Sequence, residues 1–338
     1  MKYTITIDAG STNTRAYLWD ESRRLIAAAR REVGVQVTAQ EGSNSILKGA
    51  VRDCLEELLQ NAGIGYCDVE RILASGMITS NLGLYELPHV AAPAGAEELA
   101  KGSREVLIEA VCPVPIRFLP GVKNRVEAVN SENFEAMDMM RGEEVETLAI
   151  LEAYPKGMPY LLVLPGSHTK FVLTDRSGRI TGCLTTITGE LLDCITHHTV
   201  IADAVGRSFA SEEHYDRETV LRGFETAKKT GLGRGAFAAR ILNQFVQKDK
   251  ENIALFLLGA ALESDVRSLR GSRALELSPD ITVIVSGKDP LRRAIADILE
   301  YDGFFTRVEQ YVPESNMPLS ALGSFLAAEC IISEKYIL

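Results

Sequence analysis

A short pattern of residues occurs twice in this chain, once at its N-terminus and once halfway along. In each copy an apolar strand leads into a polar turn, and a second strand, an Asp-centred turn and a third strand follow. At one constant offset the two copies match at Thr14 and Thr169, Arg15 and Lys170, Asp20 and Asp175, Ser22 and Ser177, and Arg24 and Arg179. Gly10 and Ser11 match Gly166 and Ser167 one residue out of phase. Chance and ordinary hairpin composition are the alternative, but the matches favour an internal duplication in which each half opens with a β-meander.

Residue periodicity predicts an α/β chain of two similar domains. Alternating apolar residues predict strands over 3–8, 15–20, 25–31, 69–74, 160–164, 171–175, 180–187 and 281–285. Helical spacing predicts helices over 44–61, 140–154, 189–201, 252–269 and about 290–300. The stretch Pro155-Lys156-Gly157 is the best boundary, which gives domains 1–155 and 156–338. We expect the last helix, about 318–332, to pack back near the hinge between them.

Composition excludes several classes of protein. Lys and Arg number 36 against 46 Asp and Glu, so the net charge of −10 argues against a nucleic-acid binder. The longest apolar run, 253–262, is short of the roughly 20 residues that a membrane span needs. The six cysteines are scattered without a C-x-x-C pair, which is typical of reduced thiols rather than of a disulfide framework. The first strand leaves no room for a signal peptide, so we expect a cytoplasmic protein with no membrane or nucleic-acid partner.

The two polar turns are candidates for binding phosphate. Because turns of Gly, Ser and Thr expose backbone N–H groups, two such turns on opposite sides of a cleft can hold a polyphosphate. The candidate phosphate ligands are Gly10, Ser11, Thr12, Asn13 and Arg15 in the first turn and Gly166, Ser167, His168, Thr169 and Lys170 in the second. Asp8 ends the first strand and is a candidate to hold Mg²⁺ through water; an Asx turn cap is the equal alternative.

A third polar segment follows the buried strand predicted over 281–285. It reads Ser286-Gly287-Lys288, and Gly287 would let a flat ring approach the backbone. Asp289 and Pro290 then fit the N-cap and the first residue of a helix. A simple connection between strand and helix is the alternative. No G-x-x-x-x-G-K-[ST] motif is present, so a P-loop architecture is excluded.

Five stretches, spaced over the whole chain, together resemble one known family. They are Ile7 to Ala16 (IDAGSTNTRA), Gly76 to Asn81 (GMITSN), Met140 to Glu144 (MRGEE), Leu164 to Lys170 (LPGSHTK) and Thr185 to Leu191 (TTITGEL). The set resembles the 2-dehydro-3-deoxygalactonokinases, a family of the acetate and sugar kinase, heat-shock chaperone and actin superfamily. Ala9 and Phe171 stand where that family often has Trp, and Ile187 replaces a common Met. These departures put the exact substrate in doubt more than the ATP chemistry.

The resemblance implies a fold and an activity. The implied fold has two duplicated actin-like (ribonuclease H-like) domains, each with a mixed β-sheet flanked by helices, around an interdomain ATP cleft. The implied activity is transfer of the γ-phosphoryl group of ATP, with Mg²⁺, to the 6-hydroxyl of 2-dehydro-3-deoxy-D-galactonate. Another kinase, a polyphosphate or phosphate-ester hydrolase, and a non-catalytic sugar or nucleotide sensor are the alternatives. The stereochemistry of the sugar acid and the oligomeric state, with a homodimer among the options, stay open.

The resemblance also suggests roles for residues outside the two turns. The segment 286–288 would contact adenosine, and the R-G-E-E motif would place Arg141 where it can bind the substrate carboxylate. Ser80 and Asn81 would bind hydroxyls, and His198 is a further substrate contact. For the catalytic base we expect Glu143, with Glu190 as the main alternative and Glu144 or Asp138 behind them. Without the resemblance, four acidic residues read as an ordinary helix start stabilised by the helix dipole: Asp138, Glu143, Glu144 and Glu146.

Overall fold

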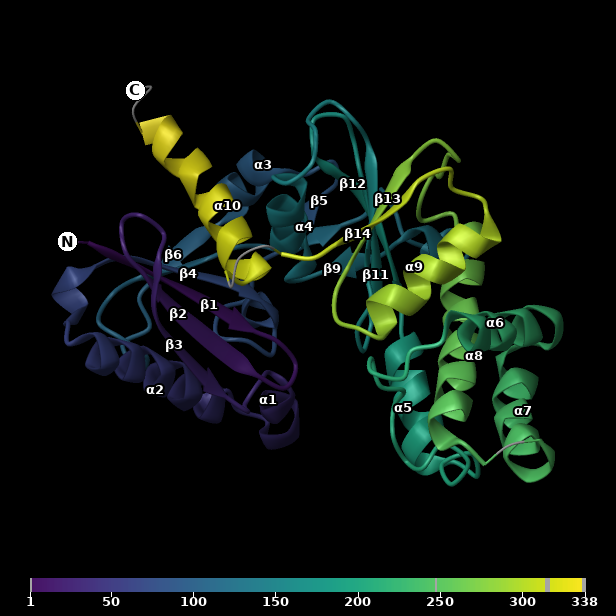
Figure 1. The fold of residues 1–338 in the computed structure, drawn as a ribbon. Coiled ribbons are helices and arrows are strands. Elements are labelled where there is room, and N and C mark those ends of the chain that lie inside the picture. The colour runs from purple at the N-terminus through teal and green to yellow at the C-terminus, as the bar shows by residue number, and fades with distance from the viewer. Residues whose placement is uncertain (1, 247, 314–316, 336–338) are drawn as a thin grey trace.

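The computed structural model describes residues 2–246, 248–313 and 317–335, which form two lobes side by side (Figure 1). The first lobe contains β1 (Tyr3–Ala9), β2 (Thr14–Trp19), β3 (Leu25–Arg31), α1 (Gln36–Glu41), α2 (Ser45–Ala62), η1 (Tyr66–Asp68), β4 (Val69–Gly76), η2 (Met77–Thr79), β5 (Val90–Ala91), α3 (Ala96–Gly102), β6 (Arg104–Val106), β7 (Ile116–Phe118), β8 (Val122–Lys123), η3 (Phe134–Ala136), β9 (Met139–Met140) and α4 (Glu143–Leu151). The rest of the chain contains β10 (Tyr160–Leu164), β11 (Thr169–Thr174), β12 (Ile180–Thr186), α5 (Thr188–His198), α6 (Arg217–Thr230), α7 (Leu232–Phe245), α8 (Lys250–Gly271), β13 (Thr282–Ser286), α9 (Leu291–Asp302), β14 (Val308–Tyr311) and α10 (Leu319–Lys335).

The two main sheets share one topology over five strands, and the first sheet has β6 as an additional antiparallel edge strand. The first has the strand order β3-β2-β1-β4-β7-β6 and the second β12-β11-β10-β13-β14. In each, the first strand pairs antiparallel with the second strand of its meander and parallel with the strand that returns after the first helical crossover. A meander followed by parallel crossover strands is the topology of the actin-like (ribonuclease H-like) fold. The expected duplicated α/β architecture is therefore confirmed.

The Asp-centred turns repeat the duplication at the level of single hydrogen bonds. The carboxylate of Asp20 accepts bonds from the backbone N–H groups two and four residues later and from the guanidinium of the arginine four residues later, at 2.9, 2.9 and 3.0 Å. Asp175 accepts the same three bonds at 2.8, 3.0 and 3.0 Å. Because an Asx turn of this kind fixes the following hairpin, both meanders begin their third strand in the same geometry.

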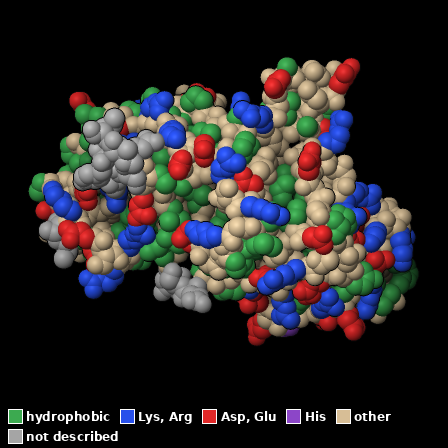
Figure 2. Space-filling view, turned by 90° about the horizontal axis from the view of Figure 1, so that it is seen from above, with side chains coloured by type: hydrophobic (Ala, Val, Ile, Leu, Met, Phe, Trp, Pro, Cys, Tyr) green, Lys and Arg blue, Asp and Glu red, His purple; other side chains and the backbone are tan. Residues whose placement is uncertain are grey.

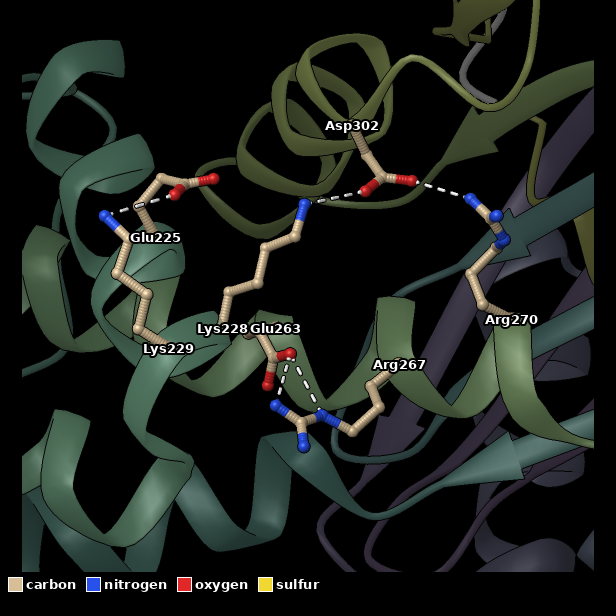
Figure 3. A network of polar contacts seen from close by, with 7 residues as sticks. All are labelled: Glu225, Lys228, Lys229, Glu263, Arg267, Arg270 and Asp302. Atoms are coloured by element: carbon tan, nitrogen blue, oxygen red, sulfur yellow. Dashed lines mark hydrogen bonds and ion pairs between the residues drawn. The ribbon is translucent and has the colours of Figure 1, made fainter.

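Each lobe has its own hydrophobic core. In the first lobe α2 covers one face of the sheet with the stripe that the sequence predicts, which includes Leu47, Val51 and Leu58. In the second lobe α8 is buried along most of its length, as expected for a helix that is apolar on nearly all sides. Ion pairs tie its outer surface to α6 and α9, where Asp302 contacts Lys228 at 3.2 Å and Arg270 at 2.9 Å (Figure 3).

A third core lies between the lobes. It joins α4 and the three-stranded sheet β5-β8-β9 to the second main sheet, through Val145, Leu162 and Ile284 among others. The terminal helix α10 packs against α3 and α4 and also touches β1 and β4, and Figure 1 shows it above the first lobe. We keep residues 1–155 and 156–338 as the proposed domains, with α4 and α10 at their junction.

One predicted helix begins later than expected. The periodicity predicts a helix from Met140, but residues 139–140 form β9 and pair with β8, so α4 begins at Glu143. Both carboxylate oxygens of Glu144 accept the backbone N–H of Gly142, at 2.9 and 2.8 Å, and so cap the start of this helix. The consequence is that Arg141 and Gly142 form a turn that faces the space between the lobes.

The face of the molecule seen from above the first view is mixed in charge (Figure 2). On the face that Figure 2 shows, Lys and Arg side chains are interspersed with Asp and Glu. Among the described residues, no helix combines the length and the apolar character that crossing a membrane requires.

Candidate active site

A cavity of about 860 Å³ lies between the two lobes. Residues from both halves of the chain line it, and the residues predicted from the sequence that do so are Gly10, Ser11, Arg15, Ser80, Asn81, Arg141, Glu143, Gly166, Ser167, His168, Lys170, Ser286 and Gly287. The tertiary structure thus gathers both polar turns, the R-G-E-E turn and the segment after β13 around one space.

A second cavity of about 970 Å³ adjoins the first. The two share Pro165, Gly166, Ser167 and Gly287, so they meet at the second polar turn. Glu190 and Lys288 line the second cavity, and its walls include apolar side chains of α8 and α9 as well as Phe209. Nearly all of its residues come from the second lobe, whereas Gln36 reaches it from the first lobe.

Both polar turns are supported by the same contacts. Behind the first turn, the backbone N–H of Gln36 donates to the carbonyl of Ser11 at 3.0 Å, and a Cβ on Gly34 would lie 2.4 Å from that carbonyl. Behind the second, the N–H of Glu190 donates to the carbonyl of Ser167 at 3.0 Å, and a Cβ on Gly189 would lie 2.1 Å from the carbonyl of the preceding Gly166. Only glycine allows these close approaches. The duplication therefore extends to the segments that hold the turns in place.

The first turn divides its residues between cavity and solvent. Gly10, Ser11 and Arg15 line the cavity. Thr12 and Asn13 lie at the tip of the turn, where the amide of Asn13 donates to Thr12 Oγ1 at 2.8 Å and its oxygen accepts from Arg30 at 2.8 and 3.1 Å. Contact of these two side chains with a ligand in the cavity is therefore less favoured by the geometry than contact of the other three.

Asp8 is the second-last residue of β1, beside the first turn. Its Oδ2 lies 3.3 Å from a guanidinium nitrogen of Arg15, and the side chain of Asp8 is 25% exposed. Burial raises the pKa of Asp8, while Arg15 acts in the opposite direction. The positive charge of Arg15 is therefore shared: it partly neutralises the Asp8 carboxylate, and it also faces the cavity.

Three glutamates at the start of α4 differ in orientation. Glu143 lines the cavity, and its Oε2 is buried without a hydrogen-bond partner among the described residues. Burial raises the pKa of Glu143, an effect that Lys170 partly offsets. Glu146 also lines the cavity; burial, with the negative charges of Glu143 and Asp8, raises its pKa to about 8. Glu144 is fully buried and bound to the backbone of Gly142, so it does not face the cavity.

Three neighbours fix the side chain of Arg141, which lines the cavity between the lobes. Its guanidinium donates to Thr79 Oγ1 at 2.8 Å and to the carbonyl of Leu87 at 2.6 Å, and it lies 3.4 Å from Nδ1 of His89. Because arginine only donates, Nδ1 of His89 accepts and its proton sits on Nε2. Burial, together with the cations Arg141, Lys123 and Lys170, lowers the pKa of His89 to about 4, so the ring is neutral at pH 7.

Lys170 of the second turn also links the two lobes. Its ammonium donates to the carbonyl of Met139 at 2.9 Å and to Thr185 Oγ1 at 2.7 Å, and the residue is only 8% exposed. The hydroxyl and backbone N–H of Thr185 in turn donate to Asp138, at 2.8 and 2.6 Å. Asp138 is thus held in an interlobe contact and lines neither cavity.

The remaining predicted residues do not line the cavity between the lobes. Glu190 is exposed and paired with His168 at 2.8 Å, on the side of the second cavity. Thr169 is buried, and its hydroxyl donates to Asp265 of α8. His198 is exposed at the end of α5 and lines neither cavity, so the structure does not bring it near Arg141.

Three residues of these cavities were missed from the sequence. Glu146 was read as part of an acidic helix start, although its position one turn after Glu143 puts both on one face of α4. His89 lies in an irregular segment without periodicity, and only the tertiary structure brings it to Arg141. Gln36 begins α1 directly after the first meander. Glu190 has the same place behind the second turn, so the duplication would have indicated Gln36.

Comparison with known proteins agrees with this geometry. Residues 8–316 match the 2-keto-3-deoxy-galactonokinase family. A curated relative from Rhizobium meliloti (strain 1021), assigned as the 2-dehydro-3-deoxygalactonokinase DgoK1, is 30% identical over 207 residues, which are 61% of this chain and 60% of the relative. A crystal structure of a Sinorhizobium meliloti protein assigned to the same activity has a TM-score of 0.70 at 23% identity, covers 99% of this chain and is itself covered completely, which shows a shared fold. Since the family match spans nearly the whole chain and includes both polar turns, the R-G-E-E turn and the segment after β13, this chain belongs to the 2-keto-3-deoxy-galactonokinase family.

Proposed function

We propose that this chain is an ATP-dependent sugar-acid kinase that phosphorylates the 6-hydroxyl of 2-dehydro-3-deoxy-D-galactonate. The observation that carries the proposal is the meeting of the two cavities at Gly166 and Ser167, with Glu143 lining the first cavity and not the second. A phosphoryl group held at this turn would lie between a nucleotide in one cavity and an acceptor in the other. Family membership supports the same assignment.

ATP would occupy both cavities in part. Its adenosine would lie in the 970 Å³ cavity, against Gly287, Lys288 and the apolar side chains of α8 and α9. Its phosphates would follow the second turn toward Arg15 and the first turn, where N–H groups and cations balance their charge. In this assignment residues 156–338 supply most of the nucleotide site and residues 1–155 most of the sugar-acid site.

The sugar acid would lie against the first lobe. Arg141 would donate to its carboxylate through the guanidinium N–H groups that the bonds to Thr79, Leu87 and His89 leave free, in charge-assisted hydrogen bonds. Its bonds to Thr79 and Leu87 fix its plane, and the Nε2–H of neutral His89 supplies a further donor. Ser80 and Asn81 line the same cavity and would bind hydroxyls.

Glu143 would take the proton of the attacking hydroxyl. The unpartnered Oε2 leaves a lone pair for that proton, and burial of the carboxylate raises its pKa and so its basicity. Glu190 is the weaker candidate because His168 already occupies one of its oxygens on the nucleotide side.

Asp8 would bind magnesium beside the cavity between the lobes; it lines neither cavity itself, but its ion-pair partner Arg15 lines that one. Among the described residues, no group of three or more His, Cys, Asp or Glu side chains is arranged to hold a metal ion. Mg²⁺ usually keeps several waters and binds few carboxylates, so Asp8, through water, and the ATP phosphates would hold it. The ion would supply neutralisation of the phosphoryl charge as the group is transferred.

An ADP-release assay over a panel of sugar acids tests the proposal. The panel should contain the 2-keto-3-deoxy acids of both C4 configurations, an aldonic acid without the keto group and an uncharged ketose. We expect ADP formation that depends on a 2-keto-3-deoxy acid and is strongest for the galactonate-derived compound. ADP release without any sugar would indicate a hydrolase, and no release with any compound would indicate a sensor; either result would overturn the proposal.

A further inference from the structure

A single buried carboxylate binds three threonines beside the second polar turn. Asp265, in the second half of α8, has no exposed surface. Its Oδ2 accepts the hydroxyl of Thr169 at 2.9 Å, and its Oδ1 accepts those of Thr186 and Thr188 at 2.5 Å each. A buried carboxylate is costly unless hydrogen bonds satisfy it, so an arrangement with three donors from three elements calls for an explanation.

The three threonines surround the second turn. Thr169 begins β11 immediately after the turn, Thr186 ends β12, and Thr188 begins α5. Gly189 and Glu190, which support the turn from behind, follow Thr188 directly. Asp265 therefore joins the strand that leaves the turn to the helix that supports it.

The first turn is held without such a carboxylate. Thr14, the counterpart of Thr169, is equally buried, but its hydroxyl donates to the backbone carbonyl of Val33 at 2.7 Å. That carbonyl precedes Gly34, so the first turn is fixed within its own meander. The second turn is instead fixed by a side chain from a helix far along the sequence.

The same helix forms a wall of the 970 Å³ cavity. Ala254, Leu257 and Leu258 of α8 line that cavity, two to three helical turns before Asp265. Because α8 is continuous and buried, the positions of the cavity wall and of the turn are linked through one rigid element.

We propose that Asp265 is a positioning residue that sets the second turn at the distance from the α8 wall required to bind a nucleotide's adenosine and phosphate groups together. This role rests on the proposed function, since it assumes a nucleotide in the adjoining cavities. Asp265 lines neither cavity. Its effect is on phosphate affinity, through the positions of Gly166 and Ser167.

Direct binding measurements with ADP and adenosine test the role. Adenosine contacts the cavity wall but has no phosphate, so Asp265→Asn should weaken ADP at least tenfold and change adenosine affinity by less than twofold. The matched control is Glu263→Gln, which alters another buried carboxylate of α8. The partner of Glu263 is the exposed Arg267, which donates to it at 2.8 and 3.0 Å (Figure 3). This control should leave both affinities within twofold.

A second variant keeps the test decisive if Asp265→Asn does not fold. Thr188→Val removes one hydroxyl with little change in volume, and we expect a smaller loss that is again confined to ADP. Equal losses for ADP and adenosine, or none in either variant, would overturn the positioning role while leaving the kinase proposal standing. Failure of the unmodified protein to bind ADP would overturn both.

Discussion

Replacement of Glu143 by Gln tests the assignment of the catalytic base most directly. Gln has nearly the same shape, and Glu143 Oε2 has no hydrogen-bond partner among the described residues that the change would remove. Loss of a general base typically costs about 10²–10⁴-fold in rate, which corresponds to about 3–5 kcal/mol of activation free energy. We therefore expect kcat to fall by that factor, while the affinities for ATP and the sugar acid stay within a few-fold.

The surroundings of Glu143 also predict the effect on stability and pH dependence. Burial, together with the negative charge of Glu143, raises the pKa of Glu144 and of Glu146 to about 8, so a neutral Gln should not destabilise the fold near neutral pH. A base works only when deprotonated, and burial raises the pKa of Glu143 above its ordinary 4.5. In the unmodified protein kcat should therefore rise with pH through that raised pKa, and Glu143→Gln should remove this rise.

The assay is steady-state ADP formation at saturating ATP over a range of pH, combined with calorimetric titration of each substrate. Glu190→Gln is the control, because Glu190 is exposed and paired with His168 on the nucleotide side. It should keep kcat within about threefold. If Glu190→Gln abolishes turnover and Glu143→Gln does not, the reasoning from cavity geometry is refuted and the two roles are exchanged.

Three further changes test other parts of the site. Asp8→Asn should lower kcat by orders of magnitude with an unchanged circular dichroism spectrum; near-normal kcat would remove Asp8 from the mechanism. Arg141→Lys should raise KM for the sugar acid about 10–100-fold, consistent with loss of a charge-assisted hydrogen bond, and KM for ATP far less; equal effects would place Arg141 on the phosphates. Burial raises the pKa of Glu146 from 4.5 to about 8, so between these values the folded state holds a proton that the unfolded state has lost, and stability falls as pH rises. Denaturant unfolding at pH 5, 6.5 and 8 should show that Glu146→Gln removes ~1.4 kcal/mol of that fall per pH unit; a fall with pH that is the same for Glu146→Gln and the unmodified protein would contradict the raised pKa.

The sequence was sufficient for the local architecture. Strand alternation and helical spacing depend on neighbouring residues only, which is why the meanders, α2 and α8 lie within a few residues of their predicted positions. The two Asp-centred turns are local in the same sense, since each carboxylate binds groups no more than four residues away. A repeated local pattern was therefore enough to predict a duplicated fold and its two polar turns.

Other features depended on contacts between distant residues. The predicted helix start at Met140 was wrong because β9 pairs with β8, a competing interaction that helical periodicity does not contain. Likewise His198 lies on a helix that the sequence predicts, yet it is exposed and lines neither cavity.

The assignment of chemical roles needed the tertiary structure most of all. Glu143 and Glu190 read alike in the sequence, as acidic residues near helix starts, and only their burial and partners distinguish them. The contact of Arg141 with Thr79 and that of Thr169 with Asp265 join residues many positions apart, which no periodicity encodes. Sequence patterns determined which elements form, because those depend on neighbours along the chain. Packing between the lobes decided which side chains share a cavity and which carboxylate oxygen, Oε2 of Glu143, has no hydrogen-bond partner among the described residues.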